Sequence, residues 1–306
     1  MRTMSKGIAT LLNGLVMGAL LNAQHRFDDF QGGLRQELAW SWQVPGNTPL
    51  NSYAPERVHF TDDWLRIEAQ PGTLYERFNT IRNLPSLPVP ALRGAWLIET
   101  RVRLERGGQS GSYLQAGLVL FQDADHYFNL HLVYDPAQGH WLRVSAGHEW
   151  DGTYQWAGLT TALWSPSEGN TVRLQIRYDP ATEQVAFFYD RENSAFWQPL
   201  NGSPRSLHDL PALQAVATQG GRIGLYVDTA GWQGSPPPVA WFDYLEIDNA
   251  PHPADINADG WVDDADLLTV LFALGEMGCH RPADINHDGQ VDDADLLTVL
   301  FAFGES

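Results

Sequence analysis

The sequence predicts an all-β sandwich joined to a small helical domain, and three observations lead to this fold class. Residues 24–250 contain short runs in which apolar and polar residues alternate, with Gly, Pro, Asn and Asp between the runs. No long helical periodicity interrupts these runs. Residues 254–276 recur almost unchanged as residues 283–305, and each copy joins an acidic loop to an apolar run that is expected to be a helix.

The first 23 residues have the features of a secretory signal peptide. Arg2 and Lys6 form a positive n-region, residues 8–21 are apolar, and Leu21-Asn22-Ala23 offers a cleavage site. A membrane anchor is the alternative, but an apolar stretch of about 14 residues is short for a bilayer. We therefore expect no membrane span, and a protein that is secreted and either extracellular or held at the cell surface.

Nine runs within residues 24–250 are expected to be β-strands of the sandwich domain. Turn signals such as Arg106-Gly107-Gly108, Asp135-Pro136 and Asp179-Pro180 separate them. A domain of about 225 residues is large enough for a substantial core. The expected strands are residues 64–69, 95–105, 114–122, 127–135, 141–148, 171–178, 184–189, 221–228 and 239–247.

The alternation within these strands predicts a core face and an open face. On residues 127–134, Phe128, Leu130 and Leu132 point to one side and are expected to be core. The other side is expected to be a concave surface that binds a polysaccharide, because aromatic rings stack on pyranose rings and fork-shaped polar groups read hydroxyls. The expected residues of this surface are Glu99, Arg101, Gln115, Asn129, His131, Trp141 and Arg143, with loop residues Trp150, Tyr154 and Trp156 as a rim.

Tryptophan content favours the sugar-binding interpretation. All 12 Trp residues follow residue 23, which is more than a core of this size requires. The alternative for the open face is an ordinary solvated polar face, which antiparallel sheets often have.

The order of segments over residues 27–248 resembles the concanavalin A-like jelly roll at the C-terminus of family 43 β-xylosidases. The segments that carry the resemblance are Asp28-Asp29-Phe30, Trp40-Ser41-Trp42, WLRIEA at 64–69, QAGLVLFQDADHYFNLHL at 115–132, GGRIGLYVDTA at 220–230 and VAWFDYLEI at 239–247. The resemblance implies a jelly-roll fold for residues 24–250. These 306 residues contain no catalytic propeller of the kind found in those xylosidases, so fold likeness alone transfers no activity.

The same resemblance implies a calcium ion in the sandwich. An acid of the first strand, Asp28 or Asp29, would approach Asp243 of the last strand, and Glu68 would be a third ligand. Hard oxygen ligands from two terminal strands would tie the chain ends together. The alternative is a set of solvated acids at the sheet edge.

The two repeats have the spacing of calcium loops. Ca²⁺ is a hard cation that takes six to eight oxygens on a loop able to wrap it. Positions 1, 3, 5, 7, 9 and 12 of the first loop are Asp255, Asn257, Asp259, Trp261, Asp263 and Asp266, with Trp261 supplying its backbone carbonyl. The same positions of the second loop are Asp284, Asn286, Asp288, Gln290, Asp292 and Asp295. Two ions are expected; two capped helices without an ion are the alternative.

Residues 251–306 resemble a type I dockerin in these loops. Position 12 is Asp, and no helix precedes either loop because Pro253 and Pro282 stand there. The resemblance implies docking onto a cohesin-bearing scaffold, in a cellulosome-like assembly for polysaccharide degradation. Loop positions 10 and 11 are Asp-Ala in both copies, where dockerins that bind cohesin often have Ser or Thr. A cohesin of unfamiliar specificity and the absence of a cohesin partner both remain open.

Charge is distributed unevenly along the chain, whose net charge is −18. Residues 251–306 have 12 Asp and Glu against Arg281 alone, so much of the acidity belongs to the calcium loops. A chain with this balance should not bind nucleic acid, because it cannot neutralise phosphates. Cys279 is the single cysteine, which excludes an intrachain disulfide.

A glycoside hydrolase acting on xylan, cellulose or β-glucan is the alternative to a binding module. Hydrolysis needs two carboxyl groups at a defined separation. The E-x-D-x-x-E run of laminarinase-like glucanases is missing, and Glu99 is the weak catalytic candidate, with Glu149 or Asp151 as a partner. An adhesion protein without sugar specificity is a third hypothesis. The sequence thus predicts a secreted carbohydrate-binding sandwich with a dockerin, and leaves catalysis open.

Overall fold

The computed structural model describes most of the chain in two compact units. The described residues are 24–42, 53–76, 80–92, 94–108, 112–191, 194, 196–231, 235–249, 254–257, 262–277, 282–286 and 288–304. One unit is built from residues 26–92 and 97–247, and the other contains residues 248–306. The expected signal peptide and Cys279 lie outside the described residues. No helix in the described part of the chain has the length and apolar character that crossing a membrane requires.

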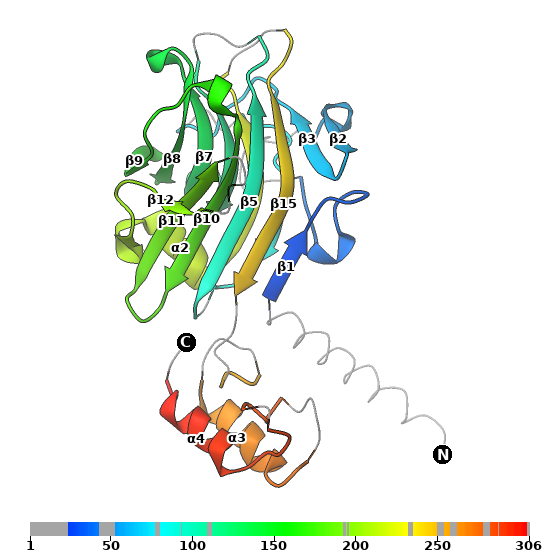
Figure 1. The fold of residues 1–306 in the computed structure, drawn as a ribbon, viewed down its shortest axis with the longest axis vertical. Coiled ribbons are helices and arrows are strands. Elements are labelled where there is room, and N and C mark those ends of the chain that lie inside the picture. The colour runs from blue at the N-terminus through cyan, green and yellow to red at the C-terminus, as the bar shows by residue number, and fades with distance from the viewer. Residues whose placement is uncertain are drawn as a thin grey trace. The chain divides into compact units, whose positions relative to one another are not determined.

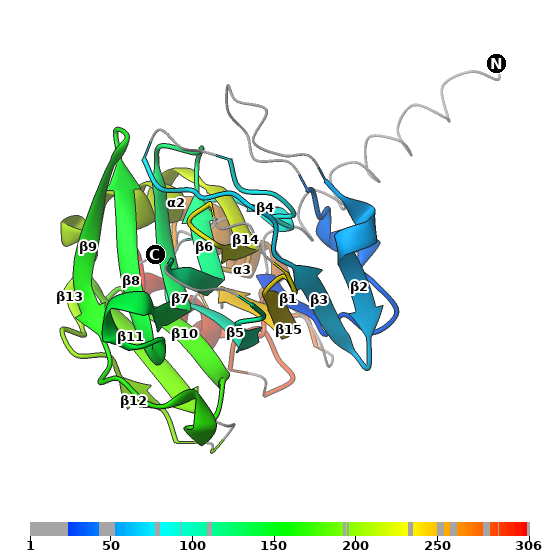
Figure 2. The same ribbon diagram turned by 90° about the horizontal axis from the view of Figure 1, so that it is seen from above.

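Two sheets form the larger unit and appear as two layers in Figure 2. Sheet A has the order β12 (Gln198–Pro199), β11 (Gln184–Arg191), β10 (Thr171–Asp179), β5 (Trp96–Glu105), β15 (Val239–Asn249), β3 (Trp64–Glu68) and β2 (Val58–Thr61). Beside this path, β1 (Gln24–Asp28) pairs with β15, and β13 (Arg205–Ser206) pairs with β11. Sheet B has the order β4 (Ser86–Val89), β14 (Gly221–Asp228), β6 (Leu114–Phe121), β7 (Tyr127–Asp135), β8 (Trp141–Trp150) and β9 (Thr153–Thr160).

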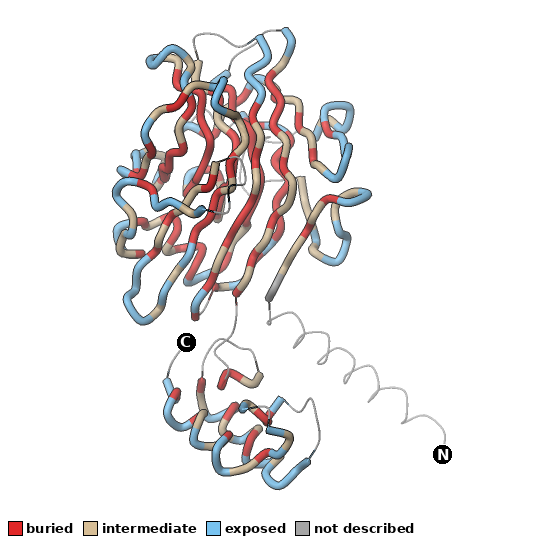
Figure 3. Tube along the Cα trace, in the orientation of Figure 1, coloured by how far each residue is buried: buried red, intermediate tan, exposed pale blue. Residues whose placement is uncertain are grey.

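The core lies between the two sheets, and the alternation of side chains explains its position. Phe128, Leu130 and Leu132 of β7 are fully buried, and the Phe128 ring lies 5.4 Å from the ring of Phe187 on β11 of sheet A. These even-numbered residues of β7 therefore face sheet A. On β5 the buried positions alternate with half-buried ones, which is visible along the strand in Figure 3.

Short turns and helices connect the strands (Figure 1). The Asp135 side chain accepts a hydrogen bond from the Ala137 N–H at 2.9 Å and so starts the turn between β7 and β8, as Asx side chains commonly do. Helix α2 (Pro211–Gln219) packs against β6, β7, β8 and β14. The 3-10 helices are Gln36–Leu38, Pro55–Arg57, Pro136–Gln138, Pro166–Glu168 and Leu207–Asp209.

The face of sheet B that is turned away from sheet A is covered by the chain that precedes β5. Leu74, Ile81 and Leu84 pack in one apolar cluster with Tyr127 of β7 and Tyr226 of β14. Every residue of β7 is buried as a result, on both faces of the sheet. This covering layer distinguishes sheet B from an antiparallel sheet with one solvated face.

The C-terminal unit contains two similar helices, α3 (Asp264–Ala273) and α4 (Asp293–Phe301). Asp263 and Asp292 cap their N-termini, and Asp266 and Asp295 complete the capping boxes. The buried residues of this unit are Ala254, Val262, Val270, Ala283, Val291, Val299 and Ala302. A core of small side chains from both repeats means that neither repeat encloses a core alone.

The predicted two-sheet, all-β fold is confirmed for the larger unit. Each of the nine expected strands is present, and their ends differ from the prediction by no more than two residues. Strands β2, β4 and β9 and helix α2 were not expected. Trp150, Tyr154 and Trp156 were expected in loops, but Trp150 ends β8 and the other two lie on the edge strand β9, so the prediction is wrong in this detail.

We expect Phe128→Ala to lower the free energy of unfolding by about 3–5 kcal/mol, because it removes a buried ring and leaves a cavity between the sheets. Urea denaturation followed by tryptophan fluorescence measures this. Phe196→Ala is the control, since the Phe196 side chain is 74% exposed and should change stability by less than about 0.5 kcal/mol. Equal effects of the two substitutions would contradict the placement of the core.

Candidate functional site

The face of sheet B that is turned away from sheet A gathers polar residues from four strands. Asn129 and His131 of β7 point to this face, because their even-numbered neighbours face sheet A. Residues paired across neighbouring antiparallel strands share a face of the sheet. Val133 of β7 pairs with Gln115 of β6 and with Arg143 of β8, so these side chains lie on the same face as Asn129 and His131. Five of the seven residues expected on the carbohydrate-binding surface lie on this face, together with the expected rim residue Trp156: Gln115, Asn129, His131, Trp141 and Arg143.

An aromatic stripe, which we define as Tyr75, Tyr154, Trp156 and Trp141, crosses this face. The ring centroids of Tyr75 and Tyr154 are 5.2 Å apart, and those of Tyr154 and Trp156 are 5.6 Å apart. The Arg143 guanidinium lies 5.6 Å from the Trp156 centroid, on the strand that also carries Trp141. Trp156 is 50% exposed and Trp141 is 46% exposed. The exposed Trp156 ring is held in place by the Tyr154 ring and the Arg143 guanidinium. A ligand with a flat apolar face could stack on such a ring.

Buried polar groups lie beneath the stripe. The His131 ring is fully buried 6.4 Å from the Trp156 ring, and neither of its nitrogens has a hydrogen-bond partner among the described residues. Burial, together with the positive charge of Arg143, lowers the pKa of His131 to about 3, so the ring is neutral at pH 7. The Asn129 side chain accepts a hydrogen bond from the Gly147 N–H at 3.0 Å. His131 therefore keeps unused donor and acceptor capacity under the exposed Trp156 ring.

A short segment, which we call the strap (residues 73–76), is fastened across one end of this face. Asp228 Oδ2 accepts hydrogen bonds from the Thr73 hydroxyl at 2.8 Å and from the Leu74 N–H at 2.9 Å. Glu149 Oε2 accepts one from the Glu76 N–H at 2.7 Å. The two carboxyl groups thus bind the backbone N–H groups of Leu74 and Glu76, the residues before and after Tyr75. They thereby place the Tyr75 ring against Tyr154, at the end of the stripe.

Glu149 is a carboxyl group of this site whose pKa is strongly raised. Burial raises its pKa to about 7 from an ordinary value of 4.5, and the hydrogen bond from the Glu76 N–H offsets only part of this effect. The negative charges of Asp125 and Glu76 raise the pKa further. Glu149 is consequently a proton donor at mildly acidic pH and an acceptor above pH 7.

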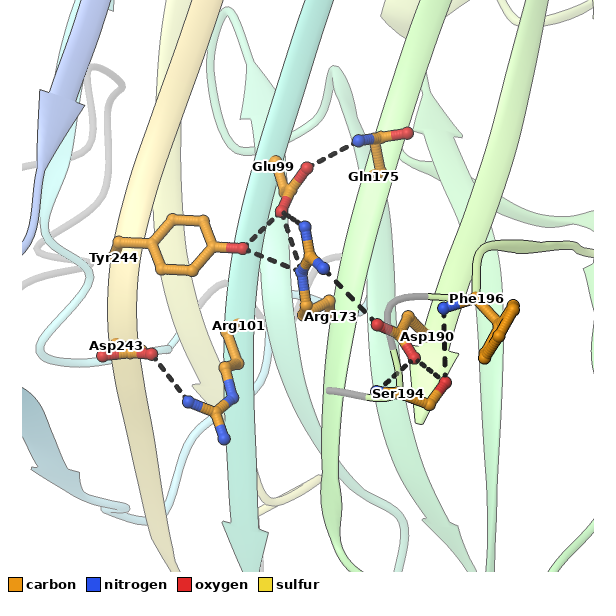
Figure 4. A network of polar contacts seen from close by, with 9 residues as sticks. All are labelled: Glu99, Arg101, Arg173, Gln175, Asp190, Ser194, Phe196, Asp243 and Tyr244. Atoms are coloured by element: carbon orange, nitrogen blue, oxygen red, sulfur yellow. Dashed lines mark hydrogen bonds and ion pairs between the residues drawn. The ribbon is translucent and has the colours of Figure 1, made fainter. Parts of the chain in front are cut away.

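Glu99 and Arg101 do not lie on this face; they belong to sheet A. Glu99 Oε1 accepts hydrogen bonds from the Arg173 guanidinium, at 2.7 Å for Nη2, and from the Tyr244 hydroxyl, while Oε2 accepts one from Gln175. Figure 4 shows this network. The structure therefore separates Glu99 and Arg101 from the other six residues. Alternation identifies which residues share a strand face, but not which sheet a strand joins.

The acids expected to hold a calcium ion in the sandwich each have another partner. Asp28 accepts hydrogen bonds from two backbone N–H groups and the Trp40 indole. Asp29 is 3.3 Å from an Arg35 guanidinium nitrogen. Glu68 pairs with Arg57 at 2.8 Å and Arg66 at 2.7 Å, and Asp243 pairs with Arg101 at 2.9 Å. Arginines compensate the negative charges of Asp29, Glu68 and Asp243, whereas Asp28 accepts hydrogen bonds from neutral N–H groups.

The loop of the second repeat is described almost completely. Asp284 accepts hydrogen bonds from the backbone N–H groups of Asp288 and Gly289, and Asn286 Oδ1 also accepts one from Asp288. Gly289 has φ +93°, which allows the sharp turn that the loop requires. In the first repeat, Asp259 and Trp261 lie outside the described residues. Within the described residues no three His, Cys, Asp or Glu side chains converge as a metal cluster.

The donor chemistry of these loops nevertheless fits a hard cation. Asp295 is fully buried and accepts three backbone N–H hydrogen bonds, from Ile285, Asn286 and Asp292. Its counterpart Asp266 is equally buried. No Lys, Arg or His is present in the described part of residues 254–304 to compensate these charges. Buried, unpaired carboxylates are costly, and oxygen ligands alone are what Ca²⁺ prefers.

The two helices of this unit expose the same apolar residues twice. Phe272 and Phe301, at equivalent positions of the repeats, are 84% and 83% exposed. Leu268, Leu271, Leu297 and Leu300 are also exposed. Since single exposed apolar residues are ordinary but repeated groups of them mark interaction surfaces, this pattern indicates a surface for a partner.

Sequence reasoning missed the strap and Tyr75. Tyr75 follows Gly72 in a segment without alternation, so no periodic signal marks it as part of a binding face. Asp228 and Glu149 appear in the sequence as acids at strand ends. Their role depends on long-range contacts between residues more than 70 positions apart.

Comparison with known proteins agrees with the fold of the larger unit. Residues 28–248 match the profile of the family described as "Beta xylosidase C-terminal Concanavalin A-like domain". The curated proteins give no match.

Several solved structures share this fold. The GH43 protein BlXynB from Bacillus licheniformis is 16% identical with a TM-score of 0.52, over 73% of this chain and 39% of that one. A xylan β-1,4-xylosidase from Bacillus halodurans C-125 is 18% identical with a TM-score of 0.52, over 72% and 38%. A GH43B protein of a Bacteroides ovatus xyloglucan locus is 19% identical with a TM-score of 0.52, over 73% and 39%. The chain spans less than half the length of these proteins.

The raised pKa of Glu149 predicts how stability changes with pH. The folded state favours the protonated form of Glu149. The free energy of unfolding therefore falls as pH rises from about 4.5 to about 7 and Glu149 becomes charged. We expect Glu149→Gln to raise the free energy of unfolding by about 2 kcal/mol at pH 8 and to leave it unchanged near pH 4.5. Denaturant titrations over this range measure it.

Glu56→Gln is the control for this prediction, because Glu56 is exposed and far from the strap in sequence. It should follow the wild-type pH profile. A Glu149→Gln protein with the same pH dependence as the wild type would show that Glu149 does not titrate in this range.

Proposed function

Because the chain belongs to the family of β-xylosidase C-terminal concanavalin A-like domains, we propose that it is a secreted protein that binds a plant polysaccharide and joins a larger degradative assembly. The sandwich is the binding module. The C-terminal unit is a dockerin-like module folded around calcium. The name of the family concerns xylosidases, and this relation supports a xylan-type polysaccharide as the first ligand to test.

The aromatic stripe is the single observation that carries the binding proposal. Trp156 and Trp141 are both about half exposed on the same face, and Arg143 lies between their positions on the sheet. A pyranose ring stacks on such indoles through its C–H face. The half-buried Arg143 guanidinium beside Trp156 would then donate hydrogen bonds to sugar hydroxyls.

Calcium would be held by the acidic loops of the repeats. Asp284, Asn286, Asp288, the Gln290 carbonyl, Asp292 and Asp295 are the proposed ligands of the second loop. Asp255, Asn257, Asp259, the Trp261 carbonyl, Asp263 and Asp266 are those of the first. A bound cation supplies the positive charge that the buried Asp266 and Asp295 lack, and it stabilises only the folded state.

The repeated apolar surface of α3 and α4 is the proposed contact with a cohesin-type scaffold. Leu268, Leu271 and Phe272 are repeated as Leu297, Leu300 and Phe301, all of them exposed. Asp264 and Asp293 border this surface, so a partner with basic residues around an apolar patch would fit it best.

A glycoside hydrolase is the second candidate function, and Glu149 is the observation that favours it. A carboxyl group with a pKa of about 7 suits a general acid at the pH of most hydrolases. Glu99, the candidate from sequence, is instead fully engaged with Arg173, Tyr244 and Gln175. Release of reducing sugar from xylan, cellulose or β-glucan that is lost in Glu149→Gln would establish this alternative.

We expect Trp156→Ala to weaken polysaccharide binding by about tenfold or more, because it removes the largest stacking ring of the stripe. Affinity gels and titration calorimetry with xylan, cellulose and β-glucan measure this. Phe196→Ala is the matched control, an exposed ring in the loop that follows β11 of sheet A. Wild-type affinity in Trp156→Ala, or no binding to any glycan, would contradict the proposal.

Removal of calcium should unfold the C-terminal unit alone. With EGTA we expect the helical signal of residues 254–304 to melt at lower temperature while the sandwich transition stays in place, because the apo loops repel themselves. Circular dichroism and calorimetry measure both transitions. Asp295→Asn should have the same effect without EGTA, whereas Asp293→Asn, an exposed helix residue, should not. A melt that is insensitive to EGTA would exclude a structural calcium.

A further inference from the structure

The outward face of sheet A carries a compact group of arginines and tryptophans, separate from the face discussed above. We call Trp64, Arg66, Arg101, Arg103 and Trp241 the arginine–tryptophan patch. They come from β3, β5 and β15, which are neighbours in the order β5-β15-β3. Trp241 pairs with Arg66 in the strand register. All five side chains are half-buried and reach the surface of the sheet.

Guanidinium groups cover both indoles of the patch. The Arg103 guanidinium carbon is 4.4 Å from the centroid of Trp241 and 5.3 Å from that of Trp64. Arg101 is 5.1 Å from Trp64, and Arg66 is 5.4 Å from Trp241. Two cations thus share each ring. Cation–π attraction holds each guanidinium flat, but it does not neutralise the mutual repulsion of the cations.

The hydrogen bonds of the patch leave only donors without partners. The buried N–H groups Nε of Arg101, Nε of Arg103 and Nε1 of Trp241 have no acceptor among the described residues. Arg101 uses Nη1 for Asp243, at 2.9 Å, and Arg66 uses Nη1 for Glu68, at 2.7 Å. Arg103 has a long ion-pair contact of 3.5 Å from Nε to Glu105, which is not a hydrogen bond. The patch therefore has N–H donors that suit an oxygen acceptor.

The neighbouring Glu99 network has a different balance of charge. There a single arginine, Arg173, meets both Glu99 and Asp190, and Glu99 accepts four hydrogen bonds (Figure 4). Negative charge exceeds positive charge in that network. In the patch, three arginines meet two well-placed carboxylates, those of Asp243 and Glu68, and Glu68 is shared with Arg57 outside the patch.

We propose that the arginine–tryptophan patch binds the carboxylate groups of a uronate-bearing polysaccharide. A planar guanidinium presents a fork of N–H donors that matches a carboxylate. Indole stacking fixes the plane of each fork in advance, which lowers the entropy lost on binding. The cations lie on β5 and β3, on either side of β15, which suits an extended chain better than a single small anion. The net charge of −18 does not prevent this, because salt screens charges beyond about 8–10 Å.

This site is independent of the aromatic stripe. The patch belongs to sheet A and the stripe to sheet B and its covering segment. The exposed rings of the stripe suit a neutral sugar face, whereas the patch offers guanidinium edges and no open ring. The two surfaces would let one chain hold a polymer that carries both neutral and acidic sugars.

The test is titration calorimetry of the full chain with polygalacturonate as the uronate probe and unsubstituted xylan as the neutral probe. We expect the double variant Arg101→Gln/Arg103→Gln to bind polygalacturonate about tenfold more weakly and xylan as the wild type does. Arg177→Gln is the matched control, an exposed arginine of sheet A that also lies over a ring, 5.2 Å from Phe188. It should stay within about twofold of the wild type.

Three outcomes would overturn the proposal. The double variant could keep wild-type affinity for polygalacturonate, Trp156→Ala could abolish that binding, or dextran sulfate could bind the patch as tightly as the uronate. If the double variant does not fold, hydrogen exchange on the wild type decides. Polygalacturonate should then protect residues 97–105 and 239–247, and protection confined to residues 141–160 would place the ligand on sheet B instead.

Discussion

The site depends on one packing constraint, the burial of both faces of β7. One face packs against sheet A, and the other requires a cover of its own. The strap and the chain after it provide that cover, and Asp228 and Glu149 fasten the strap through its backbone N–H groups. Because the cover ends at Tyr154 and Trp156, the same constraint that completes the core also leaves aromatic rings exposed at its border. The segment that covers the core of sheet B thus also forms the border of the aromatic stripe.

Compensation of charge differs between the two units. In the sandwich, acids such as Glu68, Asp243 and Asp135 each meet an arginine, at distances between 2.7 and 3.1 Å. In the C-terminal unit, the partners of the buried Asp266 and Asp295 within the described residues are backbone N–H groups. Partial charges on backbone amides do not replace a full cation in a buried site. This difference between the units supports the proposal that the C-terminal unit binds a cation.

Period-two alternation was sufficient to predict nine strands and the core residues of β7, because burial of one strand face is a local property of the sequence. It could not assign strands to sheets. Glu99 and Asn129 both occupy polar positions of alternating strands, yet one lies on sheet A and the other on sheet B. The strap could not be predicted from the sequence either, because Tyr75 is positioned by hydrogen bonds to carboxyl groups more than 70 residues away in the chain. Helix α2 is too short, at nine residues, to give a clear periodic signal.

Arginine is used to the exclusion of lysine after residue 23, and several of these arginines lie over aromatic rings of the sandwich. A planar guanidinium can stack flat on an indole, which the ammonium group of lysine cannot do. Arg143 does so beside Trp156, and Arg103 between Trp64 and Trp241. One guanidinium lies over Trp156, and half of that residue stays in solvent, whereas two guanidiniums lie over each of Trp64 and Trp241. This difference in the number of guanidiniums per ring is the physical basis for proposing a neutral ligand for one face and an acidic ligand for the other.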